Sequence, residues 1–325
     1  MNELQIMGLV VSIIAPVVVG WVIVRLGWME ASADQVLTWL FLHVCTPPLI
    51  VVLLAQQDLA TLIDLRFILA TLVMLFLIYV GLLLVHTRLL KRRLGVAAMA
   101  AFAGTKFNTV IVGLPVLLAI IGHHAIVPTI INLFAGYFTI LPATLICTYA
   151  TRVESGGTVP MAAVFLRALK KAITHPLVVA TLIGLLLSSL ELQLSPWLEK
   201  TLLTFGDAAI PLALIAIGMS LNAAGVRTNA IEIFWMSAVR VILSPLLAVV
   251  IAMAFDLQPV FAIALVISFS LPTAKMVFPL AKEEGFYVEQ SAGIISMTTV
   301  SLLLVWPIVI WICEQLWPGV IAVHS

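Results

Sequence analysis

Two lysines stand in apolar stretches that are long enough to cross a membrane, where a charged side chain is costly. Lys106 lies within Gly104–Pro115 and Lys275 within Ser268–Pro279, both far from the predicted membrane surfaces. A lysine near the centre of a bilayer costs about 2.5–3.5 kcal/mol on insertion scales, so it usually has a function or a partner. The ammonium group could bind an anion, pair with an acid, or extend to the membrane surface.

Both lysine-containing segments are predicted to interrupt their helices, because proline removes an amide donor and clashes with the preceding turn. One proline often only kinks a membrane helix, but two interrupted segments at corresponding places indicate a binding site. Each broken helix exposes amides carrying about half a positive charge at the start of its second part, and two such ends would attract an anion. The predicted substrate-binding residues are Lys106, Asn108, Thr109, Gly113, Pro115, Thr273, Lys275 and Pro279.

Three further ionisable residues lie inside apolar stretches. Asp207 could form an ion pair with a lysine, exchange protons or coordinate a cation, and the ion pair is the simplest expectation. As the one acid found deep in such a stretch, it cannot neutralise both lysines, so a substrate with two carboxylates would satisfy the remaining charge. His43 could shuttle protons or form a buried hydrogen bond. Arg240 is expected to bind backbone carbonyls or helix ends.

The composition identifies lipid as the solvent of this chain. Hydrophobic residues make up 63% of the 325 residues and charged residues 10%, against about 25% charged in soluble domains. Such a chain cannot cover itself with polar groups in water. The net charge of +1 gives no reason to expect nucleic acid as a partner. Isolated cysteines and the lack of a Gly-x-x-x-x-Gly-Lys-[Ser/Thr] loop predict no metal, no cofactor and no ATP-driven pump.

Ten membrane-spanning helices are predicted from the apolar stretches, which gives an all-α polytopic fold. Five fall in residues 1–150 and five in 175–325, with 151–174 as a cytoplasmic linker. With the N-terminus outside, eleven of the sixteen Lys and Arg residues fall in inside loops, so both termini are predicted to lie outside the cytoplasm. An odd number of helices per half inverts the second half, as an inverted repeat requires. The predicted spans are 6–24, 34–54, 66–86, 96–121, 125–149, 175–191, 199–222, 232–255, 259–282 and 290–313.

At these residues the sequence resembles the auxin efflux carrier family, which includes plant PIN transporters and bacterial permeases for carboxylates such as malonate and malate. The resemblance extends over essentially the whole chain. It is carried by Asn108 followed by Gly113 and Pro115, by the run Gly206–Leu214, by Leu271 with Pro272, and by Ala281 with Lys282 and Glu283.

The resemblance implies two inverted five-helix repeats in which spans 4 and 9 cross at their broken segments. It also implies a scaffold bundle, a mobile transport bundle and elevator-type alternating access, in a homodimer within the bacterial inner membrane. Plant members have a long loop between the halves and a proline near Val277, whereas this chain has a short linker and Pro279. The two lysines favour a small dicarboxylate over an aromatic acid such as auxin, and malonate is the leading candidate.

Other functions remain open at this point. A carrier of monocarboxylates or auxin-like anions would need one of the two lysines, with the other paired to Asp207. An anion channel would need a continuous pore. An intramembrane aspartyl protease would need two acids within the membrane, and only Asp207 qualifies. Because no acid-rich sodium site is present in the sequence, coupling to protons or uncoupled uniport is expected.

Overall fold

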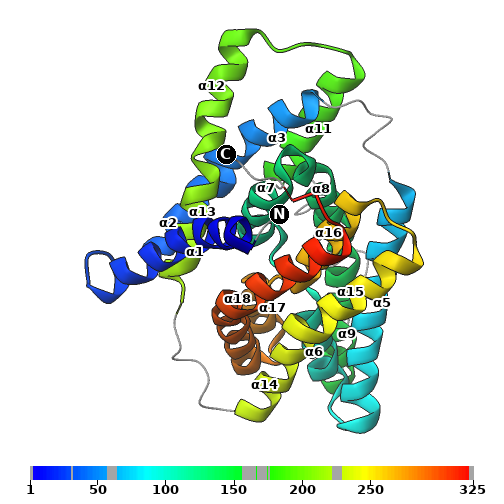
Figure 1. Cartoon of the computed structure of the whole chain (residues 1–325). Coiled ribbons are helices and arrows are strands. Elements are labelled where there is room, and N and C mark those ends of the chain that lie inside the picture. Colours follow the sequence, from blue (N-terminus) through cyan, green and yellow to red (C-terminus); the bar gives the residue numbers. More distant parts are fainter. Residues whose placement is uncertain are drawn as a thin grey trace.

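The computed structural model describes residues 3–30, 32–56, 64–155, 166, 174, 176–221 and 229–321, and these residues are almost entirely helical (Figure 1). The helices before the predicted linker are α1 (Glu3–Arg25), α2 (Ala33–Leu40), η1 (Phe41–Cys45), α3 (Thr46–Ala55), α5 (Leu65–Leu84), η2 (Val85–Leu89), α6 (Leu94–Thr105), η3 (Thr109–Gly113), α7 (Leu114–Ile121), η4 (Gly122–Ala125), α8 (Ile126–Ala135) and α9 (Tyr137–Ser155). Those after it are α11 (Pro176–Ser189), α12 (Pro196–Asp207), α13 (Ala209–Met219), α14 (Ala230–Ala238), η6 (Val239–Leu243), α15 (Ser244–Ala254), α16 (Pro259–Ser270), α17 (Val277–Glu284) and α18 (Val288–Leu316).

Among the described residues, six helical segments are long and apolar enough to cross a membrane. They are Ala33–Ala55, Leu65–Leu89, Thr109–Thr151, Pro196–Met219, Ala230–Ala254 and Val288–Leu316. Shorter apolar helices accompany them at Val11–Arg25, Leu94–Thr105, Pro176–Ser189 and Pro259–Ser270. The described part of the chain is therefore that of an all-helical, polytopic membrane protein, and each predicted span overlaps at least one of these helices.

The segment Thr109–Thr151 contains a turn at residues 122–124, between the predicted spans 96–121 and 125–149. Gly122 has φ 59° and ψ −143°, a backbone conformation that residues with a Cβ rarely adopt. It begins the short 3₁₀ helix η4, which leads directly into α8. The predicted turn is confirmed.

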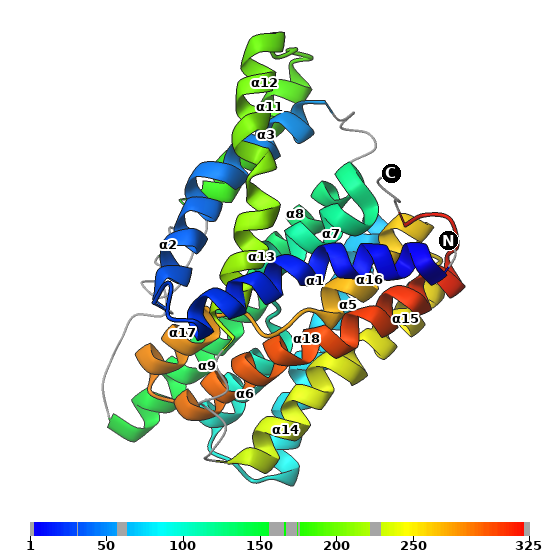
Figure 2. The same cartoon turned by 60° about the vertical axis from the view of Figure 1, so that its left-hand side comes forward.

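The helices pack as two groups, which we name bundle A (α1, α2, η1, α3 and α11–α13) and bundle B (α5–α9, η2–η4, α14–α18 and η6). In bundle A, α1 packs on α13 and α3 packs on α11 and α12. In bundle B, α6 packs on α5 and α9, while α18 packs on α14 and α16. Both views show α3, α11 and α12 projecting together from the rest of the molecule (Figures 1 and 2).

Bundle A is held by a close approach of α1 to α13 through two glycines. A Cβ on Gly20 would collide with the carbonyl oxygen of Ile215, and a Cβ on Gly218 would collide with that of Val17. Small residues bring membrane helices together in this way, because lipid supplies no hydrophobic drive for helix association. The two glycines therefore set the spacing within bundle A.

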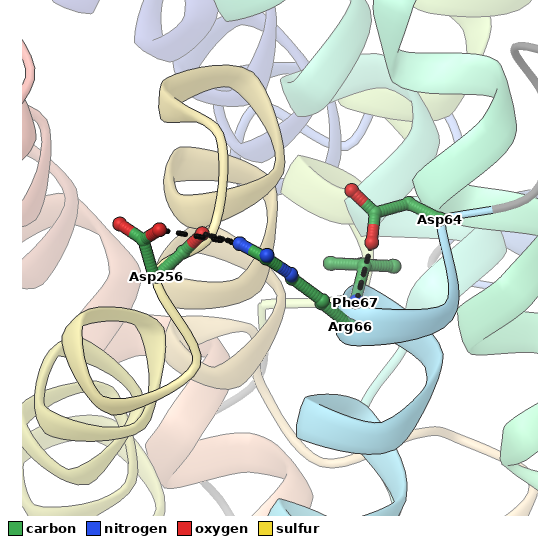
Figure 3. Close-up of polar contacts among 4 residues, drawn as sticks. All are labelled: Asp64, Arg66, Phe67 and Asp256. Atoms are coloured by element: carbon green, nitrogen blue, oxygen red, sulfur yellow. Dashed lines mark hydrogen bonds and ion pairs between the residues drawn. The ribbon is translucent and has the colours of Figure 1, made fainter.

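One end of bundle B is marked by a cap and an exposed ion pair (Figure 3). Asp64 precedes α5 and accepts a hydrogen bond from the Phe67 amide at 3.0 Å, which satisfies a donor at the helix start. Arg66 donates from Nη1 to the side chain and the carbonyl of Asp256 after α15, both at 3.2 Å. Because both side chains are exposed, this pair contributes little to stability.

The predicted interruptions of spans 4 and 9 are confirmed. Helix α6 ends at Thr105 and regular α-helix resumes at Leu114, after the π-helical η3, while α16 ends at Ser270 and α17 begins at Val277. The structure also breaks two spans that the sequence analysis treated as continuous, at Gly136 between α8 and α9 and at Ala208 between α12 and α13. Most of the predicted linker 151–174 lies outside the described residues.

Candidate functional site

The two broken segments cross each other in the interior of bundle B. Phe107 and Thr273 form an isolated antiparallel β-bridge. The Asn108 amide donates to the Pro272 carbonyl at 2.9 Å, and the Ala274 amide donates to the Lys106 carbonyl at 2.9 Å. In a membrane interior every backbone polar group needs a partner within the protein, so each broken helix satisfies groups of the other.

Thr273 fixes the crossing to two neighbouring helices. Its hydroxyl donates to the Ala103 carbonyl of α6 at 3.0 Å, and its amide donates to the Thr298 hydroxyl of α18 at 3.1 Å. All three residues are buried. The predicted site residue Thr273 is therefore at the crossing, with its hydroxyl engaged by backbone.

Arg240 supports the crossing from η6. It is fully buried and donates from Nε to the Leu271 carbonyl at 2.9 Å and from Nη2 to the Ser268 carbonyl at 3.3 Å. Its guanidinium carbon lies 5.1 Å from the ring centre of Phe107 and 5.9 Å from that of Phe269. This confirms the prediction that Arg240 binds backbone carbonyls at helix ends, and the two rings add cation–π contacts.

Lys106 is buried, and its ammonium group lies in a slot beside Gly136. A Cβ on Gly136 would collide with the Lys106 Nζ, and the same Cβ position is 3.3 Å from the carbonyl oxygens of Asn132 and Leu133. The slot is thus at the carboxyl end of α8, where partial negative charge favours a cation. Among the described residues, no acid forms an ion pair with Lys106.

Lys275 forms an ion pair that the sequence analysis did not anticipate. Its Nζ lies 2.7 Å from Oδ2 of Asp34, the second residue of α2, and the two side chains are 32% and 15% exposed. In this structure Asp34 holds Lys275, and Lys106 lies beside Gly136, so the two lysines do not face each other; their joint binding of one dicarboxylate stays a prediction. The Asp34–Lys275 pair joins α2 of bundle A to the broken span of bundle B.

A cavity of about 260 Å³ lies beside this ion pair, and Lys106 does not line it. Its lining residues are Asp34, Gln35, Thr38, Trp39, Leu42, His43 and Lys275. His43 contacts the Trp39 carbonyl through Nδ1 at 3.1 Å, and its ring stacks on Trp39 with centroids 4.9 Å apart. The Thr38 hydroxyl is buried without a hydrogen-bond partner in the described part of the chain. The cavity thus offers a cation, an imidazole and an unpaired hydroxyl.

Sequence reasoning missed the α2 wall of this cavity, although a signal was present. Residues 35, 38, 39, 42 and 43 recur at helical spacing, so they share one face of α2 and η1. Asp34 begins this face and stands at the edge of an apolar stretch, so it is not among the acids expected deep in the membrane.

Asp207 is exposed at the end of α12 and forms no ion pair with any described residue. The predicted pairing of Asp207 with a lysine is therefore wrong in this structure. Pro279 is also displaced from its expected place, because it is exposed within α17, beyond the interruption.

The remaining predicted residues gather at the start of η3 and α7. Asn108 is buried, and its carbonyl accepts from the Gly113 amide at 2.9 Å. The Thr109 hydroxyl is buried without a partner among the described residues. A Cβ on Gly113 would lie 2.7 Å from Leu271 Cδ1, so a larger residue would have to displace the Leu271 side chain where the two broken segments touch. Pro115 is buried in the first turn of α7.

An all-helical membrane protein whose broken helices cross beside a charged cavity has the architecture by which transporters bind solutes within the bilayer. The chain is thus a polytopic membrane transporter by class. Residues 5–311 match the family described as Membrane transport protein, and the chain belongs to this family, to which the auxin efflux carriers belong. It is a family of transporters and not of enzymes.

Two relatives align over nearly the whole chain. A protein of Rhizobium meliloti named "Putative malonate transporter" is 26% identical over 302 residues, which cover 91% of this chain and 92% of the relative. A protein of Methanothermobacter thermautotrophicus named "Uncharacterized transporter" is 25% identical over 306 residues, or 92% of this chain and 95% of the relative. Both names agree with the transport function of the family.

Proposed function

We propose that this protein is a secondary transporter of small organic anions, with a dicarboxylate such as malonate as its substrate, and that the cavity beside Lys275 receives the substrate. The observation that carries the proposal is the position of Lys275, a cation in an unwound membrane segment that also faces a cavity. An anion is the ligand that such a lysine attracts. The name of the Rhizobium meliloti relative adds malonate as the first dicarboxylate to test.

Substrate binding replaces Asp34 as the partner of Lys275. A substrate carboxylate competes for the ammonium group through a charge-assisted hydrogen bond, the stronger kind in proteins. A second carboxylate would lie near His43 and the Thr38 hydroxyl, which line the same cavity.

This exchange also links binding to movement. The Asp34–Lys275 pair connects bundles A and B, so a bound substrate removes a contact between them. We infer that bundle A is the scaffold and bundle B the moving part in elevator-type alternating access. The chain would then cross the bacterial inner membrane ten times, as inverted halves 1–150 and 175–325 joined by 151–174. Both termini would lie outside the cytoplasm, and two copies would form the homodimer.

One observation favours a second candidate, a carrier of monocarboxylates. Lys106 does not line the cavity, so Lys275 is the lysine among its lining residues. One carboxylate is enough to satisfy one ammonium group, so the original argument from two lysines no longer separates the substrate classes. A monocarboxylate or auxin-like anion would then bind through Lys275 alone.

Uptake by purified protein in liposomes tests the proposal. Radiolabelled malonate is supplied outside with an inward proton gradient, and protein-free vesicles serve as the control. Saturable uptake that unlabelled dicarboxylates compete away more strongly than monocarboxylates would support the dicarboxylate carrier, and collapse of the gradient would test proton coupling. Stronger competition by monocarboxylates would favour the second candidate, and folded protein without any organic-anion uptake would contradict both.

A further inference from the structure

A buried histidine and a buried glutamate meet at one end of bundle B. His86 belongs to η2 and Glu232 to the first turn of α14, and His86 Nε2 lies 3.4 Å from Glu232 Oε1. The segment η2 is π-helical, a rare conformation that is frequent at functional sites. Neither residue lines the cavity beside Lys275, and the proposed transport cycle gives the pair no role.

The second ring nitrogen of His86 shows where the neutral imidazole carries its proton. Nδ1 lies 2.8 Å from the Leu82 carbonyl oxygen, which can only accept a hydrogen bond, so Nδ1 is the donor. In the neutral ring, Nε2 is then an acceptor, and it faces Glu232 Oε1, which is also an acceptor when the carboxyl group is ionised. Two buried acceptors form no hydrogen bond with each other, and this is costly. One additional proton on Nε2 turns the contact into a charge-assisted hydrogen bond.

Arg92 and Tyr287 complete the surroundings of the Glu232 carboxylate. Arg92 Nη2 donates to Glu232 Oε2 at 3.0 Å, and the Tyr287 hydroxyl interacts with the same carboxylate. The rings of Trp235 and Tyr287 contact the His86 ring, with centroids 5.4 Å and 6.2 Å away. Because Arg92 already pairs with Glu232 as an anion, the additional proton is carried by Nε2 of His86.

The ionisable groups of the neighbouring helices have other surroundings. Helix α6 packs on η2 and carries no ionisable residue. Tyr79 of α5 interacts with Cys147 of α9, and Arg240 of η6 donates to carbonyls at the crossing. Arg88 of η2 and Glu289 of α18 are exposed. The charge of the pair is therefore set by the groups that contact it directly.

A cavity of about 360 Å³ beside the pair connects it to water. Its lining residues are Lys91, Arg92, Arg93, Val96, Glu232, Tyr287 and Gln290. The three basic residues are exposed, so the cavity is open to solvent. Glu232 lines the cavity and His86 does not, so the carboxylate stands between the buried imidazole and water and can pass a proton to it. The predicted orientation places the loop 87–95, which carries these basic residues, on the cytoplasmic side.

We propose that His86 and Glu232 form a proton-binding site that responds to the pH of the cytoplasm. When His86 Nε2 carries the proton, it donates a charge-assisted hydrogen bond to Glu232 and holds η2 against α14. When the proton leaves through the cavity, two acceptors face each other and this contact is lost. Histidine ordinarily changes its charge between about pH 5 and 8, so the contact responds within the range of cytoplasmic pH. The site is independent of which substrate the protein carries.

Solid-state nitrogen NMR of the full-length protein in liposomes tests the protonation. Histidine is labelled with nitrogen-15, and the other five of the six histidines are replaced by glutamine, so that the ring signals come from His86. Both ring nitrogens should be protonated at about pH 5.5, and Nδ1 alone at about pH 8.5. Glu232→Gln removes the anion that holds the proton, so Nδ1 alone should be protonated at both pH values. A His86 ring that keeps one state across this range in the protein with Glu232 would overturn the proposal.

Thermal unfolding in detergent tests the contact between η2 and α14. His86→Gln places an amide donor toward Glu232 at every pH, so its melting temperature should gain about 2 °C or more on that of the unaltered protein between about pH 5.5 and 8.5. His123→Gln is the control, because His123 is exposed in the turn before α8 and its difference from the unaltered protein should be the same at both pH values. A difference for His86→Gln that is equally independent of pH would contradict the proposal. Should His86→Gln fail to fold, the NMR measurement decides, because it keeps His86 in place.

Discussion

Asp34 and Lys275 form an ion pair of 2.7 Å between helix α2 and the broken span of the other bundle, beside a cavity. The pair occupies the ammonium group that a substrate anion would need. In this structure, Asp34 is therefore both the internal competitor of the substrate and a contact between the two bundles. This relationship leads to the first prediction.

The variant Asp34→Asn should bind substrate more tightly, because an amide competes for Lys275 more weakly than a carboxylate does. We expect the KM for uptake to fall about fivefold, as a partly exposed ion pair is worth about 1 kcal/mol or less. Uptake kinetics in liposomes measure the KM, with Asp34→Glu as the charge-conserving control, and a rise in KM for Asp34→Asn would contradict the competitor role.

Arg240 should be required for folding rather than for substrate affinity. In the wild-type protein, the buried Arg240 donates hydrogen bonds to the Leu271 and Ser268 carbonyls. The variant Arg240→Met removes both bonds, so the two carbonyls lose this donor. Bonds to charged groups are worth about 1.5–3 kcal/mol each, so we expect a loss of about 3 kcal/mol or more in stability. Thermal unfolding in detergent measures the loss. The exposed Arg66→Met is the control, and it should change the melting temperature little.

The contact of α1 with α13 should not tolerate a larger residue at Gly218. The variant Gly218→Val places side-chain atoms where the Val17 carbonyl lies, so the helices must separate. Overpacking of this kind costs about 1–3 kcal/mol, which thermal unfolding would register as a lower melting temperature. Gly8→Val on α1 is the matched control, because nothing lies within 4 Å of its Cβ position. Equal melting temperatures for the two variants would refute this packing.

Glu284 should make stability depend on pH near neutrality. Burial, and then the neighbouring Glu283, raise the pKa of Glu284 from 4.5 to about 7. The folded state therefore holds a proton that the unfolded state has released, and this contribution is present below about pH 4.5 and is lost as the pH rises through 7. After allowance for partial exposure, we expect about 1 kcal/mol. Glu284→Gln should remove this loss of stability between pH 5 and 8, and an unchanged pH profile would contradict the assignment.

The broken segments were predictable because their causes are local. A proline close to Gly, Ser or Thr residues makes a helix easy to unwind, so the sequence located the breaks around Lys106 and Lys275. The partner of Arg240 was predictable in kind, since a buried guanidinium beside broken helices finds freed carbonyls. These features need no knowledge of how distant helices pack.

The partners of the two lysines were not predictable, because tertiary packing decides them. Asp34 is 241 residues away from Lys275 in the sequence, and its depth in the membrane depends on how α2 meets the broken span. The slot for Lys106 exists because Gly136 lacks a side chain. The sequence around Lys106 does not show that Gly136 will lie beside it. For this reason the sequence did not reveal that Lys275 lines a cavity while Lys106 lies beside Gly136.

Malonate uptake by the Lys275→Met variant tests the central claim most directly, with Lys106→Met as the matched control. Both variants lose one buried or half-buried cation, but only Lys275 lines the proposed substrate cavity. The account predicts that folded Lys275→Met loses saturable uptake, while Lys106→Met, if folded, keeps a KM close to that of the unaltered protein. Retained affinity in Lys275→Met, together with lost affinity in Lys106→Met, would contradict the account and place the substrate at the Gly136 slot.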